Sequence, residues 1–530
     1  MLASRQPGTF WLTVASALLS HTYSAAVLGV DAYIVKVECH LDNVVPPSFT
    51  TVGLPEGAVR ESKERVMAAL KNSGFRIPQK RTTVNLAPAD IRKEGSAFDL
   101  PIALGILCAL GYVPQAALER TILVGELGLD GALRIVKGVL PITLAARKEG
   151  YKTILVPTAN GTEAALVENI QVGALENLQE VIALLNGEAE LEPVRVEGIS
   201  LLQQARAAHI DFSDVKGQEH AKRAVEVAAA GSHNAIMIGP PGSGKTMVAQ
   251  RIPTILPMLS LEEALETTKI HSVAGTLPPG VGIIGQRPFR SPHHTISDAG
   301  LVGGGTIPRP GEVSLAHHGV LFLDELPEFR KNVLEVLRQP LEAGYVTISR
   351  AKVSVTYPAS IMLVAAMNPC PCGYATDPRN ECSCTPPAIQ RYMSRISGPL
   401  LDRIDIHIEV PAVKIEELAA KSSGERSELI RDRVEAARER QRQRFREEPH
   451  MYANAHMESK ALKRYCPIPA DGEELLTTAI NRLGLSARAY DRIIKVSRTI
   501  ADIAGSDGIQ TPHLAEAIQY RSLDRQLWLG

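Results

Sequence analysis

The sequence predicts an α/β protein with three parts: a first domain of mixed strands and helices, a second domain around a parallel sheet, and a helical third part. Three observations lead to this order. Apolar strand-like runs alternate with helical patterns over residues 23–187. A buried strand, a glycine-rich loop and a helix follow one another over residues 234–252. Strand patterns then end after Val410, while helical patterns continue to Tyr520.

These patterns set the expected boundaries. Residues 1–22 form an N-terminal extension and residues 23–188 the first domain, and the linker at 189–210 begins with an acidic, proline-containing stretch. The second domain covers residues 211–411, and residues 412–530 form a helical lid. Helices are expected at 416–420, 427–446, 472–483, 487–504 and 512–520.

The composition is that of an ordinary globular protein, with 45% hydrophobic and 22% charged residues. The net charge is −1, so any surface for nucleic acid has to be local. Aromatic residues make up only 4%, which disfavours base stacking as the main binding mode. No apolar run is long enough for a membrane span, and no membrane partner is expected.

The glycine-rich loop matches the phosphate-binding P-loop pattern, G-x-x-x-x-G-K-T. Its residues are Gly239, Pro240, Pro241, Gly242, Ser243, Gly244, Lys245 and Thr246. The glycines allow backbone N–H groups to turn towards phosphates, and Lys245 can reach the β- and γ-phosphates. Thr246 can hold Mg²⁺, and the N-terminus of the following helix attracts anions. The loop therefore predicts ATP and Mg²⁺ as cofactors.

A second acidic site is expected at the end of another buried strand, Gly319 to Asp324. There, Asp324 would hold Mg²⁺ through water, and Glu325 would polarise the attacking water. A third apolar strand over residues 361–367 ends in Asn368, whose side chain can orient that water between the other two strands. Lys245, Glu325 and Asn368 are thus candidate catalytic residues of an ATPase.

Around these motifs the chain resembles the magnesium-chelatase and MCM-like branch of the AAA+ ATPases. The similar segments are Asp214-Val-Lys-Gly-Gln218, the P-loop, the Asp324-Glu325 strand, Asn368 and Leu400-Leu-Asp-Arg-Ile-Asp405. The resemblance implies that Arg403 is an arginine finger acting on the ATP of a neighbouring subunit. It also implies that Arg488, in Ser486-Ala-Arg488, is a second sensor that touches the γ-phosphate. A finger acting in trans requires an oligomer, and the family implies a homo-hexamer.

Further segments resemble the ComM/YifB family over nearly all of the chain after Tyr23. They include Phe289-Arg-Ser-Pro-His-His294, Arg309-Pro-Gly-Glu-Val-Ser-Leu-Ala-His317, Leu326-Pro-Glu-Phe329 and Asn368-Pro-Cys-Pro-Cys-Gly373. This resemblance implies a DNA translocase or helicase that drives branch migration when DNA is integrated during natural transformation. Single-stranded or branched DNA is the expected partner. The alternatives are a magnesium-chelatase subunit that remodels a metal-inserting partner and, with less support, an ATP-dependent protease.

A basic hairpin is the candidate DNA contact. Residues 345–356 alternate in a strand-like way on both sides of Arg350-Ala-Lys352. In related rings such a hairpin points into the pore, where Arg350 and Lys352 would contact phosphates; an exposed basic turn is the alternative. The arginine-rich stretch 426–446 favours a solvated helix with ion pairs such as Arg431–Glu435 over a DNA contact. His293 and His294 could be ligands, but we expect structural roles for them.

Four of the seven cysteines fall within one short segment: Cys370, Cys372, Cys382 and Cys384. Four thiolates can close a tetrahedral Zn²⁺ site, and such a knuckle at 370–384 would restrain the loop between Asn368 and Arg403. Free thiols and a redox pair are the alternatives.

The first domain resembles the proteolytic domain of Lon protease, a ribosomal S5-like fold. Lys93-Glu-Gly-Ser96 is similar to the segment around the Lon nucleophile, and residues 141–150 are similar to its lysine helix. Counting along that helix, the catalytic lysine falls on Leu140, and Lys137 lies off the alignment. A Ser–Lys dyad needs that amine as its base. We therefore expect a non-proteolytic assembly or DNA-entry module in which Ser96 is structural.

The N-terminal residues resemble a signal peptide loosely, since Arg5 precedes an apolar run at 10–19 and small residues follow at 24–26. ATP is available in the cytoplasm and not outside it, so we expect a cytoplasmic location instead. The apolar run is then explained by a start codon placed too early.

Overall fold

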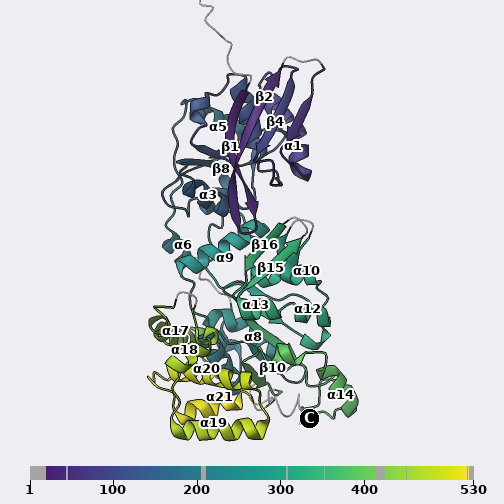
Figure 1. Ribbon diagram of the computed structural model, residues 1–530, viewed down its shortest axis with the longest axis vertical. Helices are drawn as coiled ribbons and strands as arrows, with labels where there is room; N and C mark the ends of the chain where they lie inside the picture. Colours follow the sequence, from purple (N-terminus) through teal and green to yellow (C-terminus); the bar gives the residue numbers. More distant parts are fainter. Residues whose placement is uncertain are drawn as a thin grey trace, which may run out of the picture. The chain divides into compact units, whose positions relative to one another are not determined.

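The computed structural model describes residues 19–42, 46–204, 210–305, 308–350, 353–412, 424–448, 451–521 and 523 (Figure 1). The chain divides into two compact units, and we describe each by itself. The first contains residues 1–198 and 271–283, and the second contains residues 199–270 and 284–530. Helix α9 (Leu261–Ala274) begins in the second unit and ends in the first. The sequence placed residues 271–283 inside the second domain, and their packing with the first unit is a difference from that prediction.

The first unit is built on a seven-stranded mixed sheet in the order β3-β4-β2-β1-β5-β8-β9. The strands are β1 (Leu19–Leu28), β2 (Asp31–Asp42), β3 (Phe49–Val52), β4 (Arg81–Ala87), β5 (Thr121–Leu123), β8 (Thr153–Pro157) and β9 (Gln171–Leu175). Its longer helices are α1 (Gly57–Asn72), α2 (Asp99–Ala109), α3 (Val139–Lys148) and α5 (Leu178–Leu185). The predicted α+β domain is confirmed.

Strand β1 starts earlier than the sequence suggested, inside the segment assigned to the N-terminal extension. The buried positions at its start are Ser20, Thr22 and Ser24, so the strand does not show the alternation of apolar and polar residues by which strands are predicted. The Ser20 hydroxyl donates a hydrogen bond to the Gly105 carbonyl at 2.6 Å, and the Thr22 hydroxyl donates to the Pro101 carbonyl at 3.0 Å. Helix α2 thus satisfies buried polar groups that a hydrophobic pattern cannot reveal.

The second unit contains a five-stranded parallel sheet in the order β11-β14-β17-β10-β18. The strands are β10 (Ala235–Ile238), β11 (Phe289–Arg290), β14 (Val320–Leu323), β17 (Met362–Met367) and β18 (Ile406–Glu409). Every residue of β10, β14 and β17 is buried, as expected for a parallel sheet covered on both faces. Because β17 lies between β10 and β14, the carboxyl ends of these three strands share one edge.

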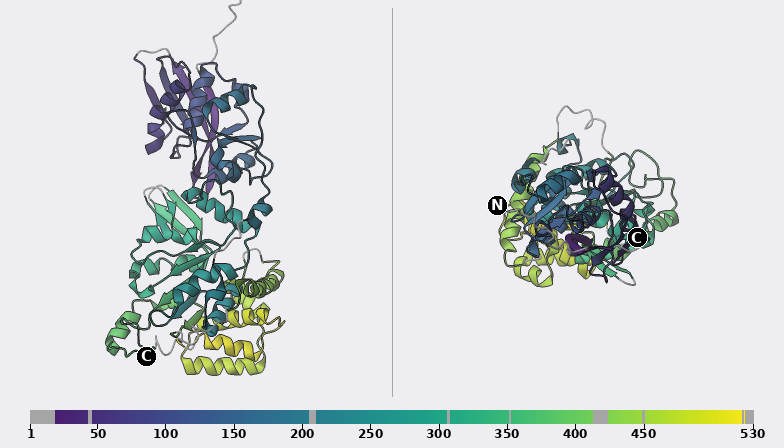
Figure 2. Two further views of the ribbon diagram at one scale, coloured as in Figure 1. Left: turned by 180° about the vertical axis from the view of Figure 1, so that it is seen from behind. Right: turned by 90° about the horizontal axis from the view of Figure 1, so that it is seen from above.

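The predicted helical lid is also confirmed. Its helices are α17 (Ser427–Arg444), α18 (Ser459–Tyr465), α19 (Ala470–Leu483), α20 (Ala487–Ile503) and α21 (Thr511–Gln519). They gather beside the sheet in opposite views (Figures 1 and 2). The short helix α18 had not been predicted, and the predicted helix at 416–420 lies outside the described residues. Lid and sheet share one hydrophobic core, which includes Met237 and Ile408 from the sheet and Val434 and Ile493 from the lid.

The arginine-rich helix α17 packs against α7 (Glu219–Gly231) and α8 (Lys245–Ile255). The expected Arg431–Glu435 pair is wrong. Arg431 donates to the Thr254 carbonyl at 3.3 Å, while Glu435 pairs with Arg442 at 3.0 Å. Contact with α8 draws Arg431 away from its helical neighbour, so tertiary packing overrides the local i,i+4 pattern.

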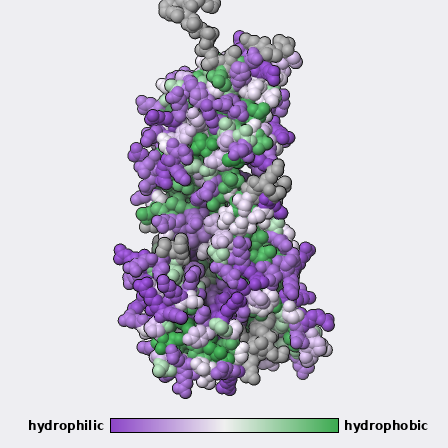
Figure 3. All heavy atoms as spheres, viewed as in Figure 1, coloured by the Kyte–Doolittle hydropathy of each residue, from purple (hydrophilic) through white to green (hydrophobic). Residues whose placement is uncertain are grey.

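Hydrophilic residues cover most of the face shown in Figure 3, and hydrophobic residues lie there in small separate groups. Among the described residues, none of the helices combines the length and apolar character that a membrane crossing requires.

Candidate functional site

The P-loop connects β10 to α8 in the geometry that its glycines require. Gly244 directly precedes α8 with φ +91°, a conformation that side chains disfavour. A Cβ atom at Gly239 would lie 2.0 Å from the Val410 carbonyl oxygen, so the loop start passes too close to the end of β18 for any other residue. The loop thus places Lys245 and Thr246 in the first turn of α8.

The Lys245 amine lies inside this loop. Its Nζ donates to the carbonyls of Gly239 and Pro240 at 2.7 and 2.9 Å, and it lies 3.3 Å from both Ser243 Oγ and Asn368 Oδ1. Burial lowers its pKa from 10.5 to about 8, against an opposing attraction from Asp324. Among the described residues, its hydrogen-bond partners are all neutral oxygens, so this buried cation is suited to receive an anionic ligand.

The acidic strand end lies next to the loop. The Thr246 hydroxyl donates to Asp324 Oδ2 at 2.7 Å, which brings together the two side chains that the sequence assigned to Mg²⁺. Oxygen ligands of this kind suit a small hard cation. The next residue, Glu325, has φ +54° and a side chain that is 59% exposed, so its carboxylate is open to water.

The strand order explains how Asn368 joins this group. It follows directly after β17, which separates the P-loop strand from the acidic strand. The 3.3 Å approach to Lys245 therefore depends on tertiary structure, although the side chain was predicted from local pattern alone. Lys245, Thr246, Asp324 and Asn368 form one connected cluster, with Glu325 beside it.

His294 lies near this cluster, in a contact that the sequence did not predict. His294 Nδ1 lies 3.2 Å from Glu325 Oε2, and its ring lies beside those of His293 and Phe329. We had expected a structural histidine. The only sequence signal was its presence in the Phe289–His294 segment of the family resemblance, since nothing local links it to Glu325.

The two predicted trans-acting arginines share a different location. Arg403 and Arg488 both line a depression of about 180 Å³, together with Glu342, Asp491, Arg492 and Lys495. Arg403 is only 5% exposed, and its guanidinium contacts Glu342 and the Pro399 carbonyl. Arg488 is 63% exposed and lies 3.9 Å from Asp402. Within the described part of the chain, neither arginine has a hydrogen bond or ion pair with the Lys245 cluster.

A buried ion pair near this depression connects the lid to the sheet. Asp405 accepts a hydrogen bond from the Asn234 backbone N–H at 3.0 Å and pairs with Arg492 of α20. Arg492 holds the pKa of this buried carboxyl well below its usual range, despite the opposing effect of burial. Asp405 was part of the resembling Leu400–Asp405 segment, but its partner could not be found from sequence.

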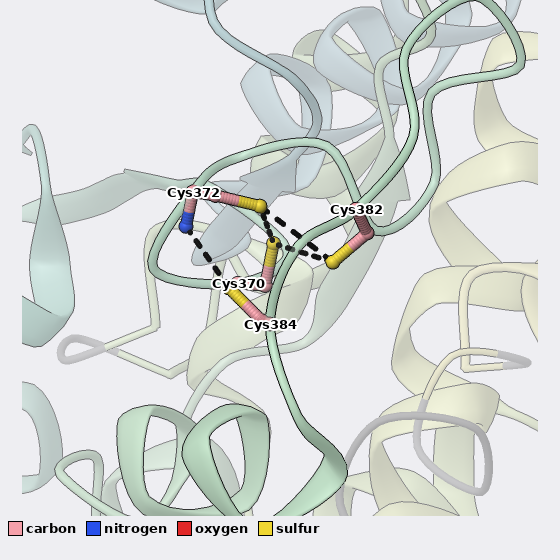
Figure 4. Close-up of side chains that lie close together, drawn as sticks. All are labelled: Cys370, Cys372, Cys382 and Cys384. Carbon is pink, nitrogen blue, oxygen red and sulfur yellow. Dashed lines mark hydrogen bonds between the residues drawn. The ribbon is translucent and has the colours of Figure 1, made fainter.

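The predicted hairpin is confirmed, while residues 351 and 352 of its basic tip lie outside the described residues. Strands β15 (Tyr345–Arg350) and β16 (Val353–Pro358) pair antiparallel, with Arg350 opposite Val353 at the turn. Arg350 is exposed, and Lys352 lies outside the described residues. The four clustered cysteines also come together, all within one loop (Figure 4).

In the first unit, the segments similar to Lon protease do not form a Ser–Lys dyad. The Ser96 hydroxyl donates to the Glu126 carboxylate. Leu140 is fully buried in α3, and its backbone N–H donates to Glu163 at 2.9 Å. Among the described residues, the structure gives Ser96 no lysine partner, so it lacks the base that such a nucleophile requires.

Comparison with known proteins agrees with this geometry. Competence protein ComM of Haemophilus influenzae is 47% identical over 512 residues, which cover 96% of this chain and 98% of that protein. The uncharacterised protein YifB of Escherichia coli is 45% identical over 96% of this chain and 98% of its own length.

The chain belongs to the ComM/YifB family. Three family models also match: "Magnesium chelatase, subunit ChlI" at residues 211–418, "Subunit ChlI of Mg-chelatase" at 37–160, and "Magnesium chelatase, subunit ChlI C-terminal" at 424–521. Lon protease 2 of Bacillus subtilis is 28% identical over 141 residues, 26% of this chain and 25% of that protein. The protein is therefore a magnesium-chelatase-like AAA+ protein, and this family implies the use of ATP and Mg²⁺.

Proposed function

We propose that this ComM/YifB protein is a cytoplasmic, hexameric, ATP-driven DNA translocase that promotes branch migration during natural transformation. The observation that carries the proposal is the near-full-length similarity to a competence protein, in a chain whose ATPase motifs lie together. The exposed Arg350 at the hairpin turn supplies a candidate contact for DNA phosphates.

For hydrolysis, we assign distinct tasks to the clustered side chains. The P-loop backbone and Lys245 bind the β- and γ-phosphates, and Thr246 with Asp324 holds Mg²⁺, which supplies charge neutralisation when bound. The exposed Glu325 carboxylate accepts a proton from the attacking water. Asn368, held beside Lys245, orients that water.

The shared depression supports a common task for Arg403 and Arg488. We assign both to the ATP of a neighbouring subunit, because both line one surface and neither contacts the Lys245 cluster of its own chain. A guanidinium there stabilises the charge that develops during phosphoryl transfer. In this arrangement the contact between Arg403 and Glu342 breaks when the nucleotide site of a neighbouring subunit packs against Arg403.

An ATPase assay with and without DNA tests the proposal. We expect the rate to rise with single-stranded or branched DNA, and we expect DNA binding to weaken with salt because phosphates dominate the contact. An ATPase rate that ignores both DNA forms at low salt, in protein that binds ATP, would contradict it.

The family models favour a second candidate, a chelatase-type subunit that remodels a metal-inserting partner. The ATPase rate of such a subunit would change with partner subunits and a porphyrin but not with DNA. The same ATPase assay therefore distinguishes the translocase from the chelatase-type subunit. We do not propose proteolysis, because the Ser96 hydroxyl is hydrogen-bonded to Glu126 and Leu140 occupies the position of the catalytic lysine in the Lon-like helix.

A further inference from the structure

Four thiols converge in the loop that follows β17. The Sγ atoms of Cys370 and Cys372 lie 3.3 Å apart, and Cys382 Sγ lies 3.7 and 3.6 Å from them. Cys384 completes the group, in which all four sulfur atoms lie within 4.8 Å of one another. A regular tetrahedral site with Zn–S bonds of about 2.3 Å has sulfur atoms about 3.8 Å apart. The three distances among Cys370, Cys372 and Cys382 range from 3.3 to 3.7 Å, at or slightly below that value.

Other states of these cysteines explain the arrangement less well. All four are free, and their closest approach is 3.3 Å, far beyond a bonded S–S distance of about 2.05 Å. Four sulfur ligands in tetrahedral arrangement are typical of zinc or an iron–sulfur centre. Four cysteine ligands leave no open coordination position, as is typical of a structural zinc site.

Backbone amides support the thiolate form of the cluster. The Cys372 N–H donates to Cys384 Sγ at 3.3 Å, and the Gly373 N–H donates to Cys370 Sγ at 3.2 Å. Figure 4 shows the sulfur atoms of Cys370, Cys372 and Cys382 facing one another, with Cys384 directed at the Cys372 amide. Hydrogen bonds of this kind reduce the repulsion between thiolates and orient metal ligands.

The loop also contacts the nucleotide site. A Cβ atom at Gly373 would lie 2.6 Å from Pro241 Cδ in the P-loop and 3.9 Å from Asn368 Cγ. Gly373 itself has φ +91°, a conformation that favours glycine and is strained for other residues. Cys370 follows Asn368 by two residues. The cysteine loop therefore packs against both the P-loop and the segment that carries Asn368.

We propose that Cys370, Cys372, Cys382 and Cys384 bind one structural Zn²⁺, which fixes this loop against Pro241 and thereby holds Asn368 in place for nucleotide binding. The assignment of zinc to these cysteines does not depend on the substrate of the ATPase. The effect on nucleotide binding rests on the proposed ATP site, but its readouts involve no DNA.

Metal content is the first test. Full-length protein purified without chelators, through a tag that binds no metal, should contain about one zinc per chain by elemental analysis. Cys372→Ser and Cys384→Ser should each lose the zinc. Cys108→Ser, at a half-buried thiol outside the cluster, should keep it. Wild-type protein without zinc, or with iron in its place, would overturn the assignment.

Wild-type protein gives an independent test if the serine variants fail to fold. Grown with Co²⁺, it should show the intense sulfur-to-metal absorption of a tetrahedral thiolate site, which would be missing if the cysteines are not ligands. Denatured without reductant after zinc removal, it should titrate all seven thiols. A shortfall of two or four thiols would indicate disulfides and overturn the zinc site.

Nucleotide affinity tests the structural consequence. In Cys372→Ser, the Kd for a fluorescent ATP analogue should rise at least about tenfold, equivalent to ~1.4 kcal/mol. Gly373→Ala should keep its zinc and still bind the analogue more weakly, because the added methyl group collides with Pro241. Unchanged affinity in zinc-free Cys372→Ser would overturn the link between zinc and the ATP site.

Discussion

Nδ1 of His294 lies 3.2 Å from Oε2 of Glu325, the carboxylate that we propose as the general base. A carboxylate paired with imidazole is less available to accept a proton from water. We propose that His294 restrains Glu325 until substrates reorganise the site.

His294→Ala should therefore raise the ATPase rate measured without DNA. The increase should be at most about fivefold, because a partly exposed side-chain contact of this kind contributes ~1 kcal/mol or less. Steady-state phosphate release measures it. His293→Ala is the comparison, since His293 contacts Thr295 and the His294 ring but has no recorded contact with Glu325, and it should change the rate less than His294→Ala. A rate below wild type in His294→Ala would mean that the histidine assists catalysis.

Lys245→Ala and Glu325→Gln should separate binding from hydrolysis. Removing the amine that lies inside the P-loop should abolish binding of a fluorescent ATP analogue. Glu325→Gln should bind the analogue as wild type does but barely hydrolyse ATP, because the water loses its base. Equal ATPase rates in Glu325→Gln and wild type would exclude that role for Glu325.

Arg403→Ala should keep ATP affinity and lower hydrolysis by roughly 10³-fold or more, as for other arginine fingers. Its trans action can be tested by mixing. Rings that combine Arg403→Ala with Glu325→Gln subunits should recover part of the activity, since some interfaces then contain an intact finger and an intact base. If mixed rings are demonstrated by mass spectrometry and remain inactive, Arg403 does not act across the interface.

Stability should depend on pH through His317. Burial lowers the pKa of its imidazole to about 4, although Glu266 lies 3.3 Å away and opposes the shift. In the unfolded chain the same imidazole has a pKa of about 6.5. Between pH 4 and pH 6.5 the unfolded state therefore binds more protons than the folded state. Stability is therefore complete above pH 6.5 and falls as the pH drops towards 4, by about 2 kcal/mol at pH 5.

Thermal unfolding between pH 7 and 5 measures this loss. His317→Asn, whose amide oxygen can still accept the Ser360 N–H, should show a smaller drop in Tm than wild type. His220→Asn changes an exposed histidine and should behave as wild type. An identical pH dependence in His317→Asn and wild type would contradict the assignment.

Local signals were sufficient for much of this fold. The P-loop, the buried strands, the β15–β16 hairpin and four lid helices follow from patterns within a few residues. Long-range contacts were not predictable. Arg431 bonds Thr254 across two helices, His294 meets Glu325 across the sheet edge, and Arg403 contacts Glu342. Such pairs depend on strand order and helix packing, which no single segment encodes.

Branch migration tests the central proposal most directly. A labelled three-strand junction, incubated with the full-length protein and ATP at low salt, should be resolved into its migrated products in a time course followed on native gels. The reaction should stop with a non-hydrolysable ATP analogue and in Glu325→Gln, and it should slow in Arg350→Ala while basal ATPase activity persists. Wild-type protein that hydrolyses ATP but neither binds nor moves the junction would contradict the account and favour the chelatase-type alternative.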